Sequence, residues 1–251
     1  LYACTPCVAD GVVFIPTGRG VLVAVDAANF SIRWASRYDY LGSAVDVPAW
    51  SPTPVIAAGD VVLLAPPDCD ELLAVDRVGG EVRWHVPRDG GMYVAAAGDG
   101  LVWVVGEEAW AVELNTGKLL WRTPCGIPTG RGALSGDRLY LPTQSGLQVL
   151  SAHTGEPIAE RPVSVAGGNL LAYEDSLYIL SAFEIRKYPD MNRGYERAVL
   201  AHRDNPADLS LSMRLGWLEY LRGEPDQALA ALWQVPAQAR AADEQRYGRL
   251  V

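Results

Sequence analysis

The side chains that could carry out chemistry are few and scattered along the chain. Cys4 and Cys7 form a C-x-x-C pair, a spacing found in redox-active sites and in half of some zinc sites. No second pair follows, and Cys69 and Cys125 are remote in the sequence. We therefore expect Cys7 to pack on an interior strand, while a disulfide or a metal-binding role for Cys4 and Cys7 stays open. Four cysteines also fit an exported protein with disulfides.

Two further motifs have the composition of ion sites. Asp68–Glu71 contains three carboxylates, and Ca²⁺ prefers oxygen ligands of this kind. The segment lacks the alternation and the glycine of an EF-hand, so we expect a solvated turn. The string PTGRG occurs at Pro16–Gly20 and at Pro128–Gly132, and glycine-rich turns with arginine can bind anions. Neither copy contains a lysine or leads into an expected helix, so we expect plain turns.

The histidines His85, His153 and His202 are expected at a strand end, in a turn and in a linker. No Ser-His-Asp or Cys-His pairing, the arrangement that activates a nucleophile, can be assigned around them. We therefore expect all three on the surface. The sequence predicts no catalytic residues and no metal ligands, and it leaves cofactor-binding residues unknown.

A repeat runs through most of the chain and would have to position any site. In each copy an apolar run ends in an acid, and a tryptophan follows eight residues later; in two copies a glycine lies four residues after the acid. The copies are Ala24–Asp26 with Trp34, Ala74–Asp76 with Trp84, and Ala111–Glu113 with Trp121. An eroded fourth copy has Ser151, Gly155 and Ala159 at the three positions. Self-similarity at a fixed period is the signature of a repeat architecture.

Each unit holds four short strand-like runs, bounded by glycine, proline and aspartate. Such a unit cannot bury both faces alone, so the sequence predicts a mainly β protein, a β-propeller of four-stranded antiparallel blades. The recurring tryptophan suits the seam between blades, where its indole N–H can reach a backbone carbonyl. Prolines recur at the expected end of the second strand: Pro16, Pro66 and Pro142. We place blades at about 1–37, 52–88, 91–125 and 129–163, and a partial blade at 167–189 within a propeller region of 1–189.

The A-V-D-x-x-x-G-x-x-x-W pattern resembles the repeat of pyrroloquinoline-quinone (PQQ)-type propellers over about residues 3–189, most closely at Val112–Trp121. That group includes quinoprotein dehydrogenases and the non-enzymatic propeller lipoprotein of outer-membrane protein assembly. A quinoprotein dehydrogenase would need a vicinal disulfide and a Ca²⁺ site, and neither can be matched here residue by residue. PQQ-type propellers more often have seven or eight blades than four and a half. The resemblance therefore implies further blades, from the chain upstream or from a partner chain.

The periodicity changes after Pro189. We expect a linker at 190–205 and a helical segment at 206–251, with one helix through Arg222, a break at Gly223 and a second helix from Asp226. The spacings of small and apolar residues in this segment resemble a tetratricopeptide repeat (TPR), with a generic helical hairpin as the alternative. A further helix is expected at 237–250.

The net charge of −9 argues against a nucleic-acid partner, which needs a basic surface, and no apolar stretch is long enough to span a membrane. We expect a non-catalytic scaffold that binds protein partners through its propeller face and helical tail, without a cofactor, exported to the periplasm or cell envelope. The alternative is an enzyme or sensor that binds PQQ with Ca²⁺, or another small ligand, at a site only partly contained in this chain. Fold alone does not fix function, so the two are separated by the propeller's centre: a buried site with a bound ligand would contradict the scaffold, and a dry, featureless channel would contradict the alternative.

Overall fold

The computed structural model describes residues 5–39, 54–161, 168–174, 176–189, 191–206 and 208–233. The chain divides into two compact units. The first is built from Leu1–Ala172 with Ile179–Arg186, and the second from Tyr173–Tyr178 with Lys187–Val251.

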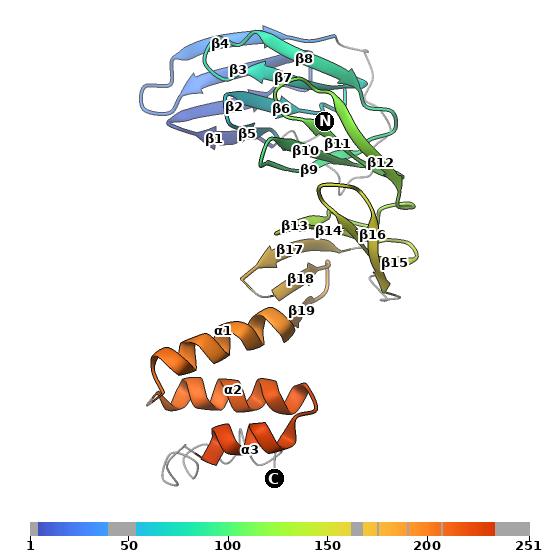
Figure 1. Cartoon of the computed structure of the whole chain (residues 1–251). Helices are drawn as coiled ribbons and strands as arrows, with labels where there is room; N and C mark the ends of the chain where they lie inside the picture. The colour runs from blue at the N-terminus through green and yellow to red at the C-terminus, as the bar shows by residue number, and fades with distance from the viewer. Residues whose placement is uncertain are drawn as a thin grey trace. The chain divides into compact units, whose positions relative to one another are not determined.

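The prediction of four-stranded antiparallel blades is confirmed (Figure 1). Blade 1 contains β1 (Cys7–Ala9), β2 (Val12–Pro16), β3 (Val21–Asp26) and β4 (Ile32–Arg37). Blade 2 contains β5 (Ile56–Ala58), β6 (Val61–Leu64), β7 (Glu71–Asp76) and β8 (Val82–Pro87). Blade 3 contains β9 (Tyr93–Gly98), β10 (Leu101–Val105), β11 (Glu108–Glu113) and β12 (Leu119–Pro124). Blade 4 contains β13 (Ala133–Ser135), β14 (Arg138–Thr143), β15 (Gly146–Ser151) and β16 (Pro157–Arg161).

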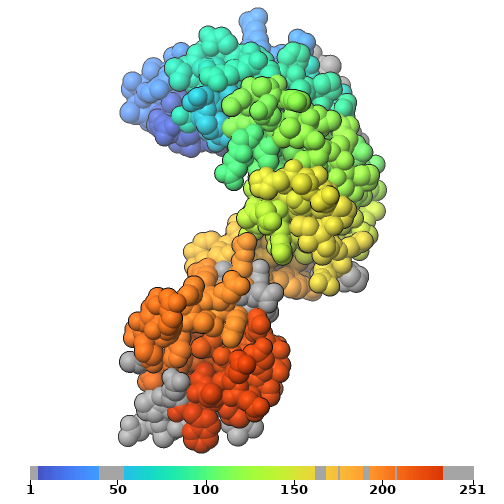
Figure 2. All heavy atoms as spheres, in the orientation of Figure 1, coloured from blue at the N-terminus to red at the C-terminus, as the bar shows by residue number. Residues whose placement is uncertain are grey.

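The strands of each blade pair in sequence order, and the first strands of successive blades lie next to one another. β1 neighbours β5, β5 neighbours β9, and β9 neighbours β13. The first strand of each blade is therefore the innermost one, and the tryptophan-bearing fourth strand is the outermost. Figure 2 shows the blades of the first unit packed directly side by side, from blue through green to yellow.

The acid of the repeat caps the turn between the third and fourth strands. The Asp76 carboxylate accepts hydrogen bonds from the backbone N–H groups of Val78, at 2.8 Å, and Gly79, at 2.7 Å, and it pairs with Arg83. These hydrogen bonds from the Gly79 and Val78 amides, together with the one from Arg83, lower the pKa of Asp76 to about 2. Asp26 caps the same turn in blade 1. The acid of the motif thus has a local structural role.

The tryptophan of each of the first three blades packs on the next blade. The indole N–H of Trp34 donates to the Arg77 carbonyl at 3.2 Å, that of Trp84 to Leu114 at 2.8 Å, and that of Trp121 to Ala152 at 3.1 Å. In every case the acceptor is the residue directly after the acid position. This confirms the expected seam and the expected indole hydrogen bond.

The motif glycine provides the surface on which the tryptophan lies. A Cβ atom added to Gly80, Gly117 or Gly155 would lie 2.7, 2.7 or 2.4 Å from an indole atom of the preceding blade. All three glycines have a positive φ, which glycine adopts without strain. The four-residue spacing in the sequence therefore encodes a contact between blades.

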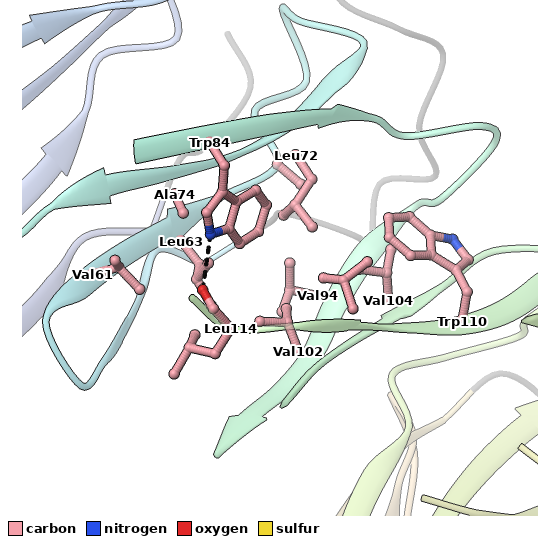
Figure 3. Close-up of a cluster of buried hydrophobic side chains, with 12 residues drawn as sticks. Val61, Leu63, Leu72, Ala74, Trp84, Val94, Val102, Val104, Trp110 and Leu114 are labelled. Atoms are coloured by element: carbon pink, nitrogen blue, oxygen red, sulfur yellow. Dashed lines mark hydrogen bonds between the residues drawn. The ribbon is translucent and has the colours of Figure 1, made fainter. Parts of the chain in front are cut away.

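The core lies in the seams between blades. Figure 3 shows the seam between blades 2 and 3, where Trp84 and Leu63 of one blade meet Val102 and Leu114 of the next. Equivalent clusters fill the seams between blades 1 and 2 and between blades 3 and 4. Burial of these side chains is the main source of stability for the repeat.

The fifth sheet has three strands, as expected for a partial blade: β17 (Asn169–Tyr173), β18 (Ser176–Leu180) and β19 (Ile185–Pro189). Three helices follow, namely α1 (Met191–Asp204), α2 (Leu209–Leu221) and α3 (Pro225–Trp233). The expected linker at 190–205 is wrong, because most of it forms α1. Asp208 caps α2, and Gly223 follows its end with φ +80°, at the break that the sequence predicts. The helix expected at 237–250 lies outside the described residues.

Candidate interaction surface

The acidic motif Asp68–Glu71 is not the solvated turn that its composition predicts. Asp68 is 3% exposed and bridges blades 1 and 2. Its carboxylate accepts the Gly20 N–H at 2.8 Å and the Tyr38 hydroxyl at 3.0 Å. Within this motif Asp70 is exposed and Glu71 is partly exposed. Both donors to Asp68 belong to blade 1 and Asp68 belongs to blade 2, so this carboxylate ties loops of the two blades together.

A buried arginine that no sequence motif indicates has a similar role in the connection between blades 2 and 3. Arg88 is 2% exposed, and its guanidinium donates to the carbonyls of Pro66, Cys69, Gly91 and Met92 at 2.7–3.3 Å. Burial lowers the pKa of Arg88, partly opposed by the nearby Asp70 carboxylate. Its donors are satisfied by backbone carbonyls, as a buried guanidinium requires.

The second PTGRG copy forms part of a third bridge. The Tyr93 hydroxyl accepts the Gly132 N–H at 2.7 Å and donates to the Gly130 carbonyl at 3.2 Å, which joins blades 3 and 4. Arg131 lies over the Tyr93 ring, with its Cζ 5.2 Å from the centroid. Burial raises the pKa of Tyr93 and lowers that of Arg131. The first copy is also bound across blades, through Gly20, so the two PTGRG turns are inter-blade contacts.

The described cysteines pack in the interior. Cys69 is 1% and Cys125 is 1% exposed, and burial raises the pKa of both thiols, that of Cys125 to about 12. A thiol with so high a pKa is a poor nucleophile at neutral pH. Cys7 packs against the cluster between blades 1 and 2, on the strand expected for it. Cys4 lies outside the described residues, so its pairing stays a prediction.

The histidines do not come together. His85 lies on β8, where its Nδ1 is 2.9 Å from a Glu71 carboxylate oxygen, and His153 is exposed in a turn. His202 is on helix α1, where a linker was expected, with Nδ1 3.4 Å from the Ser212 hydroxyl. Within the described ranges, no group of three or more His, Cys, Asp or Glu side chains is arranged to hold a metal ion.

In the second unit, α2 and α3 pack closely through small residues. A Cβ atom on Gly216 would lie 2.7 Å from the Leu232 side chain and 3.1 Å from the Ala228 carbonyl. These are residues whose spacing resembles a tetratricopeptide repeat. The close approach is what such a repeat needs, although a generic helical hairpin also provides it.

The second unit contains an incompletely satisfied buried carboxyl. Glu219 is 6% exposed, and its Oε2 atom has no hydrogen-bond partner among the described residues. Burial raises the pKa of Glu219, and the nearby Glu224 adds to the rise while His202 opposes it. Leaving a buried polar atom unpaired costs stability.

Helix α2 is apolar on two sides. Leu215 and Gly216 face the interior, while Trp217, Tyr220 and Leu221 are 43%, 46% and 49% exposed. The Trp217 and Tyr220 rings stack with centroids 6.1 Å apart. Their i, i+3, i+4 spacing would have identified this surface in the sequence. We call Trp217, Tyr220 and Leu221 the aromatic face of α2.

The fold and its seams define the class: the chain is a PQQ-like β-propeller repeat protein. Residues 3–181 match the model of the family described as outer membrane protein assembly factor BamB, and the chain belongs to that family. No curated protein matches the chain. Of the helices in the described part, none is both long and apolar enough to cross a membrane.

Solved structures support the fold. BamB from Moraxella catarrhalis matches with a TM-score of 0.58 at 16% identity, over 75% of this chain and 58% of that one. The Pan2 WD40 domain from Neurospora crassa matches with a TM-score of 0.54 at 12% identity, over 75% and 63%. A quinohemoprotein alcohol dehydrogenase from Pseudomonas putida HK5 has a TM-score of 0.48 at 16% identity, over 73% of this chain and 38% of that one. The chain thus spans less than two thirds of the length of these structures.

Proposed function

We propose that this protein is a non-catalytic scaffold that binds another protein through the aromatic face of α2. The observation that carries the proposal is the exposure of Trp217, Tyr220 and Leu221 on one side of a helix whose other side is already buried. An exposed cluster of large apolar side chains, which its own unit leaves uncovered, is typical of a surface that binds a protein partner. Tryptophan and tyrosine are also the residues enriched among binding hot spots.

The propeller unit supports this assignment by what its motif residues do. The acid caps a turn, the glycine receives an indole, and the tryptophan fills a seam. Asp68 and Arg88, the most deeply buried charged groups of this unit, bind loops of neighbouring strands and blades. We therefore assign the propeller the role of a rigid platform, and the second unit that of a TPR-like recognition module.

Membership of the BamB family supports a location of the proposed scaffold in the cell envelope, with export to the periplasm. A tagged full chain that stays in the cytoplasmic fraction after osmotic shock would contradict this location. The net charge of −9 fits a protein partner better than a nucleic acid.

The test uses the full chain with photo-crosslinking. A benzophenone amino acid at Trp217 should cross-link one discrete envelope protein, and the same group at the exposed Phe183 is the matched control. The double change Trp217→Ser with Tyr220→Ser should weaken binding of the purified partner at least tenfold, because these side chains form the contact. Equal cross-linking at both positions, or an unchanged dissociation constant, would refute the proposal.

A fluorescence titration with PQQ, with and without Ca²⁺, tests the ligand-binding alternative. The scaffold proposal predicts no saturable quenching of the tryptophan fluorescence and no rise in melting temperature. Saturable binding would replace the scaffold with a quinone-binding propeller.

A further inference from the structure

Each of blades 2, 3 and 4 has an apolar face that receives the blade before it. In blade 2 this receiving face is formed by two residue pairs on β6 and β7, Val62 opposite Val75 and Leu64 opposite Leu73. All four are at most 3% exposed, in the cluster that contains Phe14 and Leu22 of blade 1. The glycine of the next turn completes the face by receiving the tryptophan.

The equivalent strands of blade 1 pair in the same register and form the same face, but no described blade covers it. Val13 lies opposite Val25 and Ile15 opposite Val23, which are the positions of the two buried pairs of blade 2. Ile15 is 38% exposed, and the three valines are partly exposed. Val8 on the inner strand is 67% exposed. A sheet face composed of aliphatic residues is built to be covered.

The turn of blade 1 lacks the glycine that the turns of blades 2, 3 and 4 share. Phe30 occupies the position of Gly80, since its N–H donates to the Asp26 carbonyl at 2.9 Å, as that of Gly80 donates to the Asp76 carbonyl at 3.0 Å. The φ of Phe30 is +62°, in the left-handed region that glycine favours. Phe30 is 80% exposed.

Phe30 determines which kind of fourth strand can dock on the receiving face of blade 1. At the equivalent glycines an added Cβ would lie 2.4–2.7 Å from the indole of the preceding blade, far inside van der Waals contact. Phe30 has a Cβ and a ring at that place, so a strand that carries tryptophan cannot dock there in the usual way. A strand with a small residue can, and the chain itself contains one, because β16 has Ala159 at the tryptophan position.

We propose that the receiving face of blade 1 docks one more propeller blade of the same polypeptide, whose fourth strand carries a small residue in place of tryptophan. Phe30 then fills the space that tryptophan fills in the other seams, so the aromatic ring comes from the receiving side. The inference rests on the seams and is independent of the proposed function of α2.

The test attaches a known blade to this face. A second copy of residues 129–167, which includes β13 to β16 with Ala159, is fused ahead of the full chain. We expect the extra blade to dock, which at least halves the fluorescence of the apolar dye ANS and raises the melting temperature by several degrees. The matched control fusion has Ala159→Trp in the extra copy alone, and it should leave both quantities as in the parent chain.

Phe30→Gly provides the reciprocal control. With this change the tryptophan-bearing extra blade should dock, because glycine restores the usual receiving turn. Equal docking of both extra blades beside the native Phe30 would overturn the proposal. Docking of neither blade, whether Phe30 is kept or replaced by glycine, would overturn it as well.

An internal swap supplies a second measurement that needs no added blade. Gly80→Phe alone should unfold the seam between blades 1 and 2, and Trp34→Ala added to it should recover stability, as the reversed arrangement predicts. A double variant no more stable than Gly80→Phe alone would show that a phenylalanine cannot replace the tryptophan from the receiving side, against the proposal.

Discussion

The two units differ in where they place their tryptophans. In the propeller unit Trp84, Trp103, Trp110 and Trp121 are less than 10% exposed, and the buried Arg88 has a carbonyl for its donors. In the helical unit Trp217 is 43% exposed. Buried polar atoms without a described partner occur in both units, for example Arg131 Nη2 in the propeller and Glu219 Oε2 in the helices. The repeat tryptophans therefore fill the seams between blades, whereas Trp217 lies on a surface that its own unit leaves exposed.

This difference shows which tryptophans indicate the fold and which indicate a surface for recognition. A repeated tryptophan in a propeller reports a seam, because every copy meets the same glycine and carbonyl of the next blade. A tryptophan outside the repeat has no such assigned partner. The unit with the weaker sequence motif is therefore the better candidate for recognition.

The largest expected effect comes from removing a seam tryptophan. Trp84→Ala should lower the free energy of unfolding by about 3–5 kcal/mol, because it deletes a buried ring and leaves a cavity between blades 2 and 3. Trp217→Ala is the control and should cost about 0.5 kcal/mol or less. Urea unfolding of both variants measures the contrast. Similar losses would show that α2 needs its aromatic face for folding.

Arg88 tests whether buried polar groups are structural in the propeller. Arg88→Met keeps much of the volume but strips the carbonyls of Pro66 and Gly91 of their donor, at a cost of about 3 kcal/mol. Arg83→Met, which removes an exposed ion pair, should cost about 1 kcal/mol or less. Comparable urea midpoints for the two variants would contradict the role given to Arg88.

Gly117 and Gly126 have similar φ angles, and together they distinguish the cost of a steric clash from the cost of backbone strain. Gly117 and Gly126 have φ +70° and +78°, but only Gly117 has an indole within reach of an added Cβ. Gly117→Ala should cost about 2–3 kcal/mol, from strain and from the clash with Trp84. Gly126→Ala should cost about 1 kcal/mol from strain alone. Equal melting temperatures would mean that the seam relaxes around a methyl group.

The smallest expected change in the free energy of unfolding concerns the helical unit, and it is a gain in stability rather than a loss. The pKa of Glu219 is raised in the folded state, so its protonated form favours folding at low pH, and this benefit is lost as pH rises through the folded pKa. Glu219→Gln should therefore stabilise the helices by about 1 kcal/mol at neutral pH and by nothing below about pH 4. Circular dichroism at 222 nm during urea unfolding at both pH values measures this.

The exposed Glu196 on α1 provides the control for that comparison. Glu196→Gln should leave the stability at neutral pH unchanged within error. A Glu219→Gln variant that is less stable than the parent at neutral pH would show that the carboxylate has a stabilising partner.

Much of the propeller could be predicted because its information is local. The interval from acid to tryptophan spans one turn and two strands, so Asp76 and Trp84 define the hairpin without any remote partner. The same holds for Asp208 at the start of α2 and Gly223 after its end, where capping chemistry is contained in a few residues. The linker prediction failed at α1, because its first turn has no acidic residue and the start signal that the sequence does contain, Asp190 directly before Met191, was given no weight.

The sequence by itself therefore determined the four-stranded blade, the tryptophan at its seam, and helices α2 and α3. The repeat period and the capping residues that define these elements depend on interactions over short distances along the chain. Only the tertiary structure decided that Asp68 is a buried bridge, because its partner Gly20 lies 48 positions away. It also decided that Arg88 is enclosed by carbonyls and that the face of blade 1 is open beside Phe30. Burial and pairing depend on which distant segments meet, and composition does not contain that information.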